Sequence, residues 1–300
     1  MRALWLFVLA GCRFHAADSV DDGGRDTPPP PIDAIDADVD IDAAPLGPWG
    51  APQLVTELSS IANDDDPTLT GDLLEIYFAS DRVVANSEDI YVATRPSASA
   101  AFGAPTLVAE LSSAAFDSNV DVSADGLTIT LTSNRDGNFD LYIATRPDRQ
   151  SAWSTPVLVP GVNSNAGEFG MVLSDDLKTA VLCSNRGSSE ALFRATRSAA
   201  TASFPTPTKL TELETSANEC DAMLPDPRTI YFTRDSVQTG IDLFVATSTD
   251  GTTFDAAQPI TELNTVGRDG DPWVAADQRT MVFASNRAGT PLDDIYISTR

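Results

Sequence analysis

The chain has 300 residues, of which 44 are acidic and 19 are basic, and its formal net charge is −25. This charge excludes nucleic acid and anionic lipid headgroups as electrostatic partners. The only histidine is His15, which argues against histidine-based catalysis and most zinc sites. Hydrophobic residues make up 42% of the chain, enough for one large folded domain.

The first residues predict an exported lipoprotein. The apolar run from Ala3 to Ala10 is too short to cross a bilayer as a helix and is typical of a removable signal peptide. It leads to Leu9-Ala10-Gly11-Cys12, which resembles the bacterial lipobox. We expect a signal peptide over residues 1–11 and a lipid on Cys12 that anchors the chain in the bacterial cell envelope, at the outer membrane, facing the periplasm or the cell surface.

Residues 12–48 are rich in Asp, Ala and Pro and contain the run Pro28-Pro29-Pro30-Pro31. They hold too few large apolar residues to offset the entropy of ordering. We expect a disordered acidic tether that separates a folded domain from the membrane.

One phrase occurs five times after the tether, as in Asp140-Leu141-Tyr142-Ile143-Ala144-Thr145. Its threonines are Thr94, Thr145, Thr196, Thr247 and Thr299. A period of about 50 residues is typical of solenoids, propellers and other arrays of identical units. Residues 49–300 therefore form one repeat domain.

Each repeat predicts four short strands. In the second copy these are Thr106–Leu111, Asn119–Ser123, Leu127–Ser133 and Leu141–Thr145, with turns at Asp125-Gly126 and Asp136-Gly137. Four antiparallel strands in one repeat are the blade of a β-propeller. The fold class is therefore all-β, with five four-stranded blades.

The two ends of the domain predict how the ring closes. The last repeat ends on its third strand, and a spare strand follows Trp49 at the start. Pairing the spare strand with Ile295–Thr299 completes the last blade. A linear array is the alternative, but it would leave exposed sheet edges at both ends.

The repeat also carries a family resemblance. Ser123-Ala124-Asp125-Gly126-Leu127 and Ser133-Asn134-Arg135-Asp136-Gly137 resemble the WD-repeat-like repeats of TolB-like propellers in the bacterial envelope. The resemblance covers about 250 residues, because it extends over all five repeats. It implies a propeller and leaves the function open.

Candidate functional residues lie where the innermost strands begin, at one mouth of the axial channel. Oxygen ligands there suit a hard cation such as Ca²⁺. The candidate metal ligands are Asp66, Asn119, Asp121, Asp221 and Asp271. The candidate ligand-binding residues are Trp273, Asp271, Asp66, Asp121, Glu168 and Asp221. Trp273 either fills the core or offers an aromatic platform.

Carboxylates around such a channel also resemble arabinanase-like glycosidases, in which an acid and a base flank the glycosidic bond. Because acids occupy equivalent places in nearly every repeat, we interpret them as structural and predict no catalytic residue, no enzyme activity and no required cofactor. The repeated arginines are expected to pair with an acid of their own blade, Arg135 with Asp140.

Cys183 and Cys220 lie on neighbouring repeats. They could pair in an oxidising compartment, and two buried free thiols are the favoured interpretation.

Taken together, these features predict a monomeric envelope lipoprotein whose propeller is a non-catalytic scaffold for a protein or peptide of the envelope. A carbohydrate- or calcium-binding head is the first alternative. An arabinanase-like glycoside hydrolase is the second.

Overall fold

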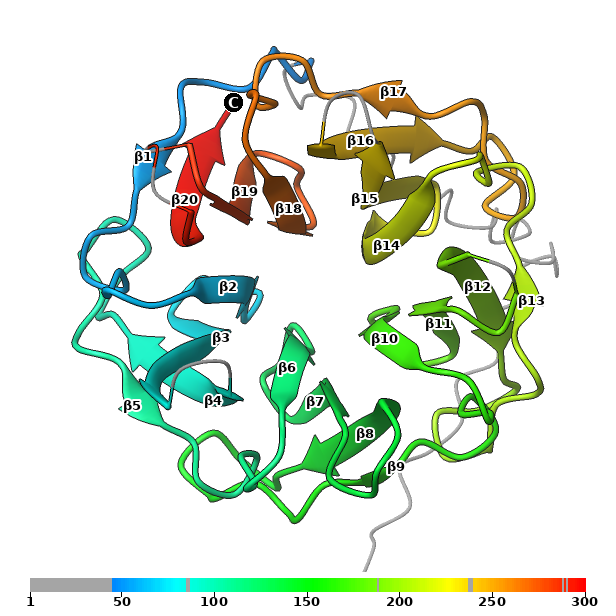
Figure 1. The fold of residues 1–300 in the computed structure, drawn as a ribbon, viewed down its shortest axis with the longest axis horizontal. Helices are drawn as coiled ribbons and strands as arrows, with labels where there is room; N and C mark the ends of the chain where they lie inside the picture. Colours follow the sequence, from blue (N-terminus) through cyan, green and yellow to red (C-terminus); the bar gives the residue numbers. More distant parts are fainter. Residues whose placement is uncertain (1–44, 85–86, 188, 237–239, 288, 290) are drawn as a thin grey trace, which may run out of the picture. The chain divides into compact units, whose positions relative to one another are not determined.

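Twenty short strands form five separate four-stranded antiparallel sheets in the computed structural model. The structure describes residues 45–300, apart from 85–86, 188, 237–239, 288 and 290. The sheets surround a central axis as the blades of a propeller (Figure 1). The expected all-β, five-bladed fold is confirmed. Within the described ranges, no helix has the length and hydropathy needed to cross a bilayer.

In each blade the strands run from the axis outward. The innermost strands are β2 (Asp64–Leu69), β6 (Asp117–Val122), β10 (Glu168–Leu173), β14 (Asn218–Asp226) and β18 (Asp269–Val274). The second strands are β3 (Glu75–Val84), β7 (Thr128–Ser133), β11 (Thr179–Ser184), β15 (Thr229–Ser236) and β19 (Thr280–Ser285). The third strands are β4 (Ser87–Thr94), β8 (Asp140–Thr145), β12 (Ala191–Thr196), β16 (Gly240–Thr247) and β20 (Asp294–Thr299). The outer strands are β5 (Thr106–Leu107), β9 (Val157–Leu158), β13 (Thr208–Lys209), β17 (Gln258–Pro259) and β1 (Gln53–Leu54).

The ring closes as the sequence predicts. The sheet order β1-β20-β19-β18 places the first strand at the outer edge of the last blade. Gln53 pairs with Ile297 and Leu54 pairs with Tyr296. This pairing covers the edge that β20 would otherwise expose.

The core lies between the faces of adjacent blades. At the junction of blades 5 and 1, Trp273 and Val282 pack in one buried cluster with Leu69, Ile76 and Phe78. Equivalent clusters fill the other junctions. Because both faces of every sheet are covered by a neighbour, the second strands are almost continuously buried.

A buried ion pair occupies the upper end of every blade, which we define as the end where the innermost strand begins. The pairs are Arg82–Asp64, Arg135–Asp117, Arg186–Glu168, Arg234–Glu219 and Arg287–Asp269. The expectation of a pair within each blade is confirmed.

The prediction that Arg135 pairs with Asp140 is wrong. Asp117 and Asp140 both lie opposite Ser133, on either side of the second strand. Arg135 forms its ion pair with Asp117, whose side chain is completely buried. A carboxylate without access to water needs a cationic partner far more than the half-buried Asp140 does.

A second set of arginines covers the lower end of the blades. The guanidinium group of Arg300 lies 4.1 Å from the ring centroid of Trp49, and that of Arg146 lies 4.4 Å from Trp153. These arginines end the repeated Thr-Arg phrase, and the aromatic residues open the outer-strand segment. The stacking explains why both residue types recur in the repeat.

Replacing Arg135 with Met should lower the free energy of unfolding by about 3–5 kcal/mol, because the Asp117 carboxylate would remain buried without its cation. Chemical denaturation of the purified domain measures this loss. The control is Asp140→Asn, which should cost about 1 kcal/mol or less. Equal losses in the two variants would contradict the assigned pairing.

Candidate functional site

A ring of five residues narrows the channel near its upper end, with one residue from each innermost strand. We call Asp66, Asn119, Gly170, Asp221 and Asp271 the channel ring. Each has a φ between 41° and 52°. Each also lies at a β-bulge, where the innermost strand has one extra residue relative to the second strand.

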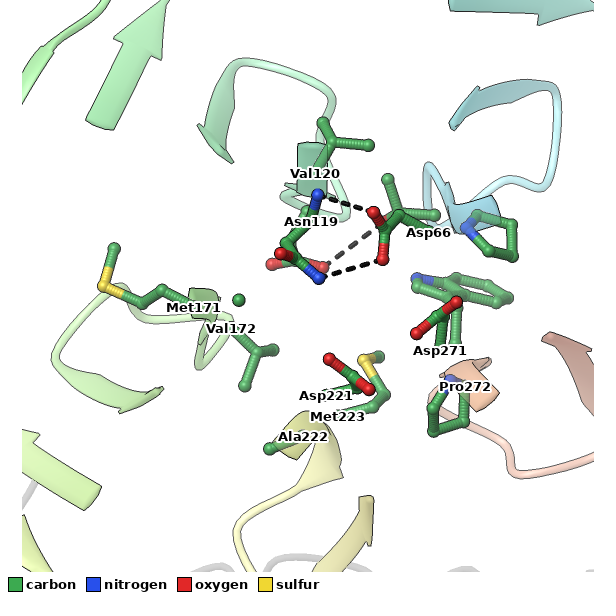
Figure 2. Close-up of a pocket in the computed structure, with 15 residues that line it drawn as sticks. Asp66, Asn119, Val120, Met171, Val172, Asp221, Ala222, Met223, Asp271 and Pro272 are labelled. Atoms are coloured by element: carbon green, nitrogen blue, oxygen red, sulfur yellow. Dashed lines mark hydrogen bonds between the residues drawn. The ribbon is translucent and has the colours of Figure 1, made fainter. Parts of the chain in front are cut away.

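The bulge explains the choice of residues in the channel ring. A positive φ is most readily adopted by Gly, Asn and Asp. The ring contains only these three residue types, and its side chains gather around the axis (Figure 2). The acids of the ring therefore recur because the backbone conformation selects them, and the same bulge brings their carboxyl groups together.

The ring carboxyl groups have different partners. Asn119 donates two hydrogen bonds to Asp66, from its backbone N at 2.7 Å and from Nδ2 at 3.0 Å. Thr233 Oγ1 donates to Asp221 at 2.7 Å. Arg268 Nη2 donates to both oxygens of Asp271 at 2.8 Å. Only Asp271 therefore has a cation bonded to it among these three acids.

Burial and the Asp271 carboxylate beside it raise the pKa of Asp221 to about 7. Burial also raises the pKa of Asp66 well above its usual range, and the neighbouring Asp271 adds to this effect. Protonation near neutral pH is unusual for Asp and is typical of functional carboxyl groups. The ring therefore combines carboxyl groups whose pKa values are raised with one, Asp271, that is bonded to an arginine.

The ring borders a cavity of about 50 Å³ at the channel mouth. Its walls continue along the innermost strands with apolar side chains, among them Val120, Met171 and Met223. Figure 2 shows these side chains around the carboxyl groups. The cavity therefore has both polar and apolar walls.

The sequence-predicted residues divide into two groups. Asp66, Asn119, Asp221 and Asp271 meet in the ring, and Asp121 lines the same cavity. Thr68 donates to Asp121 at 3.3 Å, and burial raises the pKa of Asp121 to about 7.

Glu168 and Trp273 lie elsewhere. Glu168 is fully buried and pairs with Arg186 at 2.9 Å, as the structural acid of blade 3. Trp273 is 5% exposed and belongs to the core cluster between blades 5 and 1, with one side on the cavity. The structure therefore places the indole as a core residue at the channel wall.

Three charged residues beside the ring did not emerge as candidates from the sequence. Arg268 Nη1 donates to Asp293 at 2.9 Å, and Glu88 is 8% exposed. Glu88 and Asp293 each directly precede the repeated phrase, in blades 1 and 5. The residue type at that position differs between blades. This difference is the sequence feature that could have identified Glu88 and Asp293 as candidates.

Three aromatic residues form a second feature of the upper end, at blades 2 and 3. The ring centroids of Phe116 and Phe139 are 5.9 Å apart, and those of Phe139 and Phe169 are 5.5 Å apart. All three side chains are half-buried. We call them the aromatic trio. They lie outside the aromatic positions that every repeat shares.

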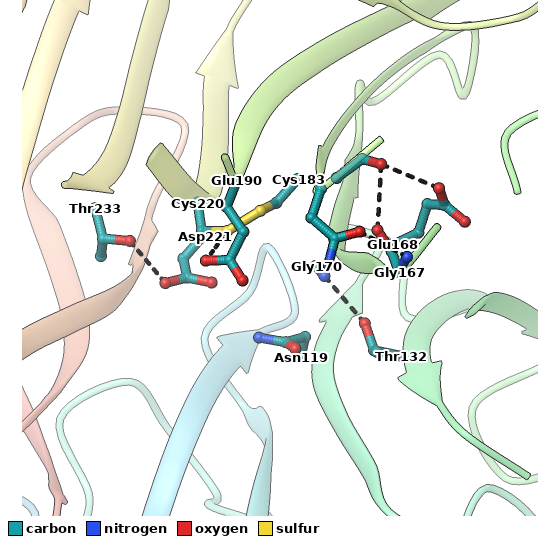
Figure 3. The surroundings of a disulfide bond; sticks show 12 residues. Asn119, Thr132, Gly167, Glu168, Gly170, Cys183, Glu190, Cys220, Asp221 and Thr233 are labelled. Carbon is teal, nitrogen blue, oxygen red and sulfur yellow. Dashed lines mark hydrogen bonds between the residues drawn. A yellow bond between two sulfur atoms is a disulfide. The ribbon is translucent and has the colours of Figure 1, made fainter. Parts of the chain in front are cut away.

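Cys183 of β11 and Cys220 of β14 form a disulfide between blades 3 and 4 (Figure 3). The interpretation as two free thiols is wrong. The Cα atoms are 5.0 Å apart, which lies within the usual range for a disulfide. Cys220 directly precedes Asp221, so the bond links the channel ring to the neighbouring blade.

No protein-family model matches the chain, and no curated protein sequence matches it. Solved structures do resemble it. A TolB protein from Agrobacterium tumefaciens has a TM-score of 0.50 and 17% identity, over 78% of this chain and 76% of that one. An endo-arabinase from Bacteroides thetaiotaomicron has a TM-score of 0.55 and 11% identity, over 85% and 98%. A GH62 α-L-arabinofuranosidase from Coprinopsis cinerea has a TM-score of 0.52 and 12% identity, over 79% and 90%.

These likenesses establish the fold, and the expected TolB-like propeller is confirmed at that level. They contradict the expectation that the chain is not an enzyme, because the similar propellers include several glycoside hydrolases. Repetition of the acids does not exclude a catalytic site, for a physical reason. The bulge explains why an acid recurs in several blades, but it leaves each acid with different partners and therefore different chemistry.

Proposed function

We propose that the chain is a glycoside hydrolase that acts at the mouth of the channel. The observation that carries this proposal is the unequal state of the ring carboxyl groups. Asp221, with a pKa of about 7, is about half protonated at neutral pH, whereas Asp271 accepts two hydrogen bonds from Arg268. Glycoside hydrolysis requires one carboxyl group that donates a proton and a second that stays ionised.

The roles follow from the contacts. Asp221 protonates the glycosidic oxygen, and the neighbouring Asp271 keeps the pKa of Asp221 raised. Asp66 lies on a non-adjacent blade, and two hydrogen bonds from Asn119 hold its carboxylate. In its ionised form Asp66 is suited to activating water or stabilising an oxocarbenium-like transition state. Its raised pKa means that this form becomes populated only as the pH rises.

The aromatic trio supports a sugar substrate. Aromatic side chains provide large apolar surfaces, which suit the apolar face of a sugar ring. The trio lies at the same end of the channel as the ring and is partly exposed. Since similar propellers include an endo-arabinase and an α-L-arabinofuranosidase, arabinose-containing polysaccharides are the first substrates to test.

We also propose that the chain is a lipoprotein of the cell envelope, with a signal peptide over 1–11, a lipid on Cys12 and a tether over 12–48. These segments lie outside the described residues, except for the last part of the tether. The support is the lipobox-like Leu9-Ala10-Gly11-Cys12 after a short apolar run. The disulfide between Cys183 and Cys220 is compatible with an oxidising compartment.

Asp221→Asn and Asp66→Asn should each lower kcat on arabinan or arabinoxylan by about 10²–10⁴-fold, because each removes a proton-transfer group. Release of reducing sugar measures the rate. Asp221→Asn should lose much less on a dinitrophenyl arabinoside, whose leaving group needs no protonation. Asp125→Asn, in a turn at the lower end, is the control and should keep wild-type activity. A wild-type protein inactive on all arabinosides and arabinose-containing polysaccharides, or a fully active Asp221→Asn, would refute the proposal.

The pH profile of the wild type should fall on its alkaline side, near pH 7. Asp221 must carry its proton to act as an acid, and its pKa of about 7 means that the proton is lost as the pH rises through that value. Initial rates between pH 4 and 9 give the profile. The alkaline fall should disappear from the residual activity of Asp221→Asn, and its persistence there would reject Asp221 as the acid.

The full-length chain expressed in a bacterium should partition into the detergent phase of Triton X-114 and incorporate labelled palmitate. Cys12→Ser should remain in the aqueous phase without label, because a lipid chain supplies most of the membrane affinity. Identical partitioning of the two proteins would contradict the lipid anchor.

A further inference from the structure

A second group of acids lies beside the channel ring, at the junction of blades 5 and 1. Asp65 and Asp66 come from β2, and Glu88 comes from β4 of the same blade. One carboxylate oxygen from each of the three residues lies within 4.8 Å of those from the other two. We call these three residues the junction acids. Asp66 belongs to both groups, whereas Asp65 and Glu88 take no part in the proposed hydrolysis.

The nearby arginine does not bond to these acids. Arg268 directs Nη1 to Asp293 and Nη2 to Asp271. Among the described residues, no ion pair joins an Arg or Lys to Asp65, Asp66 or Glu88. Clustered buried carboxylates without a bonded cation repel one another strongly.

One oxygen of the junction acids has no partner. Asp65 is 9% exposed, and its Oδ1 atom is buried without a hydrogen bond in the part of the chain that the structure describes. Burial, with the charge of Glu88, raises the pKa of Asp65. Burial and the charges of Asp66 and Asp271 raise the pKa of Glu88 to about 8. An orphaned buried carboxylate oxygen costs free energy unless a proton or a cation meets it.

We infer that Asp65, Asp66 and Glu88 bind one Ca²⁺ ion at the junction of blades 5 and 1. Calcium takes oxygen ligands at about 2.3–2.6 Å, so oxygens up to about 4.8 Å apart can all contact one ion. Both oxygens of Asp66 accept hydrogen bonds from Asn119, and each keeps a further lone pair for a metal. Water would complete the coordination shell, as is common for calcium.

The position gives this ion a structural role. It would join the innermost strand β2 to the third strand β4, next to the blade that closes the ring. Asp64 N donates to Asp293 O at 3.0 Å across the same junction. The ion would therefore stabilise blade 1 beside the closing junction, and it would share Asp66 with the channel ring.

Titration calorimetry of chelator-treated protein with CaCl₂ tests this inference. Wild type should bind one ion, and Glu88→Gln should weaken binding at least about tenfold, since it removes a charged ligand. Asp65→Asn should do the same, and it serves as a second variant if Glu88→Gln folds poorly. Glu190→Gln is the matched control. Glu190 occupies the same repeat position in blade 3, and its loss should leave the affinity within about threefold.

The melting temperature provides an independent readout. Calcium should raise it in wild type and in Glu190→Gln, because an ion that binds only the folded state stabilises that state. Calcium should not raise it in Glu88→Gln.

Three results would overturn the inference. They are no calcium binding by wild type at millimolar concentration, equal weakening by Glu88→Gln and Glu190→Gln, and loss of calcium binding in Asp221→Asn with retention in Glu88→Gln, which would place the ion in the channel ring. No substrate is present in these measurements. Calcium binding by an inactive Asp221→Asn would therefore separate the two proposals.

Discussion

The buried arginine–carboxylate pair is the interaction on which the upper half of the propeller depends. In blade 2, Arg135 bonds to Asp117 and to the carbonyl oxygen of Leu111, and it stacks on Tyr142 with 4.9 Å between the guanidinium carbon and the ring centroid. One guanidinium group thus joins the incoming loop, the innermost strand and the third strand. The channel-ring residue follows two positions after the paired acid. The pair therefore fixes the point from which the ring is built.

The blades share this frame and differ at their junctions. At the junction of blades 2 and 3, Phe139 and Phe169 are in contact. The same two repeat positions hold Asp293 and Asp65 between blades 5 and 1. Between blades 3 and 4, Cys220 occupies the position of Phe169 and Asp65. These two positions thus supply aromatic side chains, acidic side chains and one cysteine of the disulfide around a single mouth. Repetition provides the scaffold, and the departures from it provide the chemistry.

The two proposals have one physical origin, which is the excess of buried carboxyl groups over cations at the mouth. Arg268 bonds to Asp271 and Asp293. The remaining buried acids must hold protons or a metal ion, because ionised carboxylates in a poorly solvated site repel one another. A proton on Asp221 gives a catalytic acid. A calcium ion on Asp65, Asp66 and Glu88 stabilises blade 1 beside the closing junction.

The sequence by itself determined the fold, the blade count and the closing strand, because these depend on hydrogen bonds between neighbouring segments that the repeat reveals. It also located Asp66, Asn119, Asp221 and Asp271, since each innermost strand carries its ring residue at the same place. The tertiary structure decided the contacts between blades, including the disulfide, the aromatic trio and the junction acids. The tertiary structure also determines that Arg135 pairs with Asp117 and not with Asp140. Those choices depend on burial and on distances between side chains from different strands, which spacing along one chain does not specify.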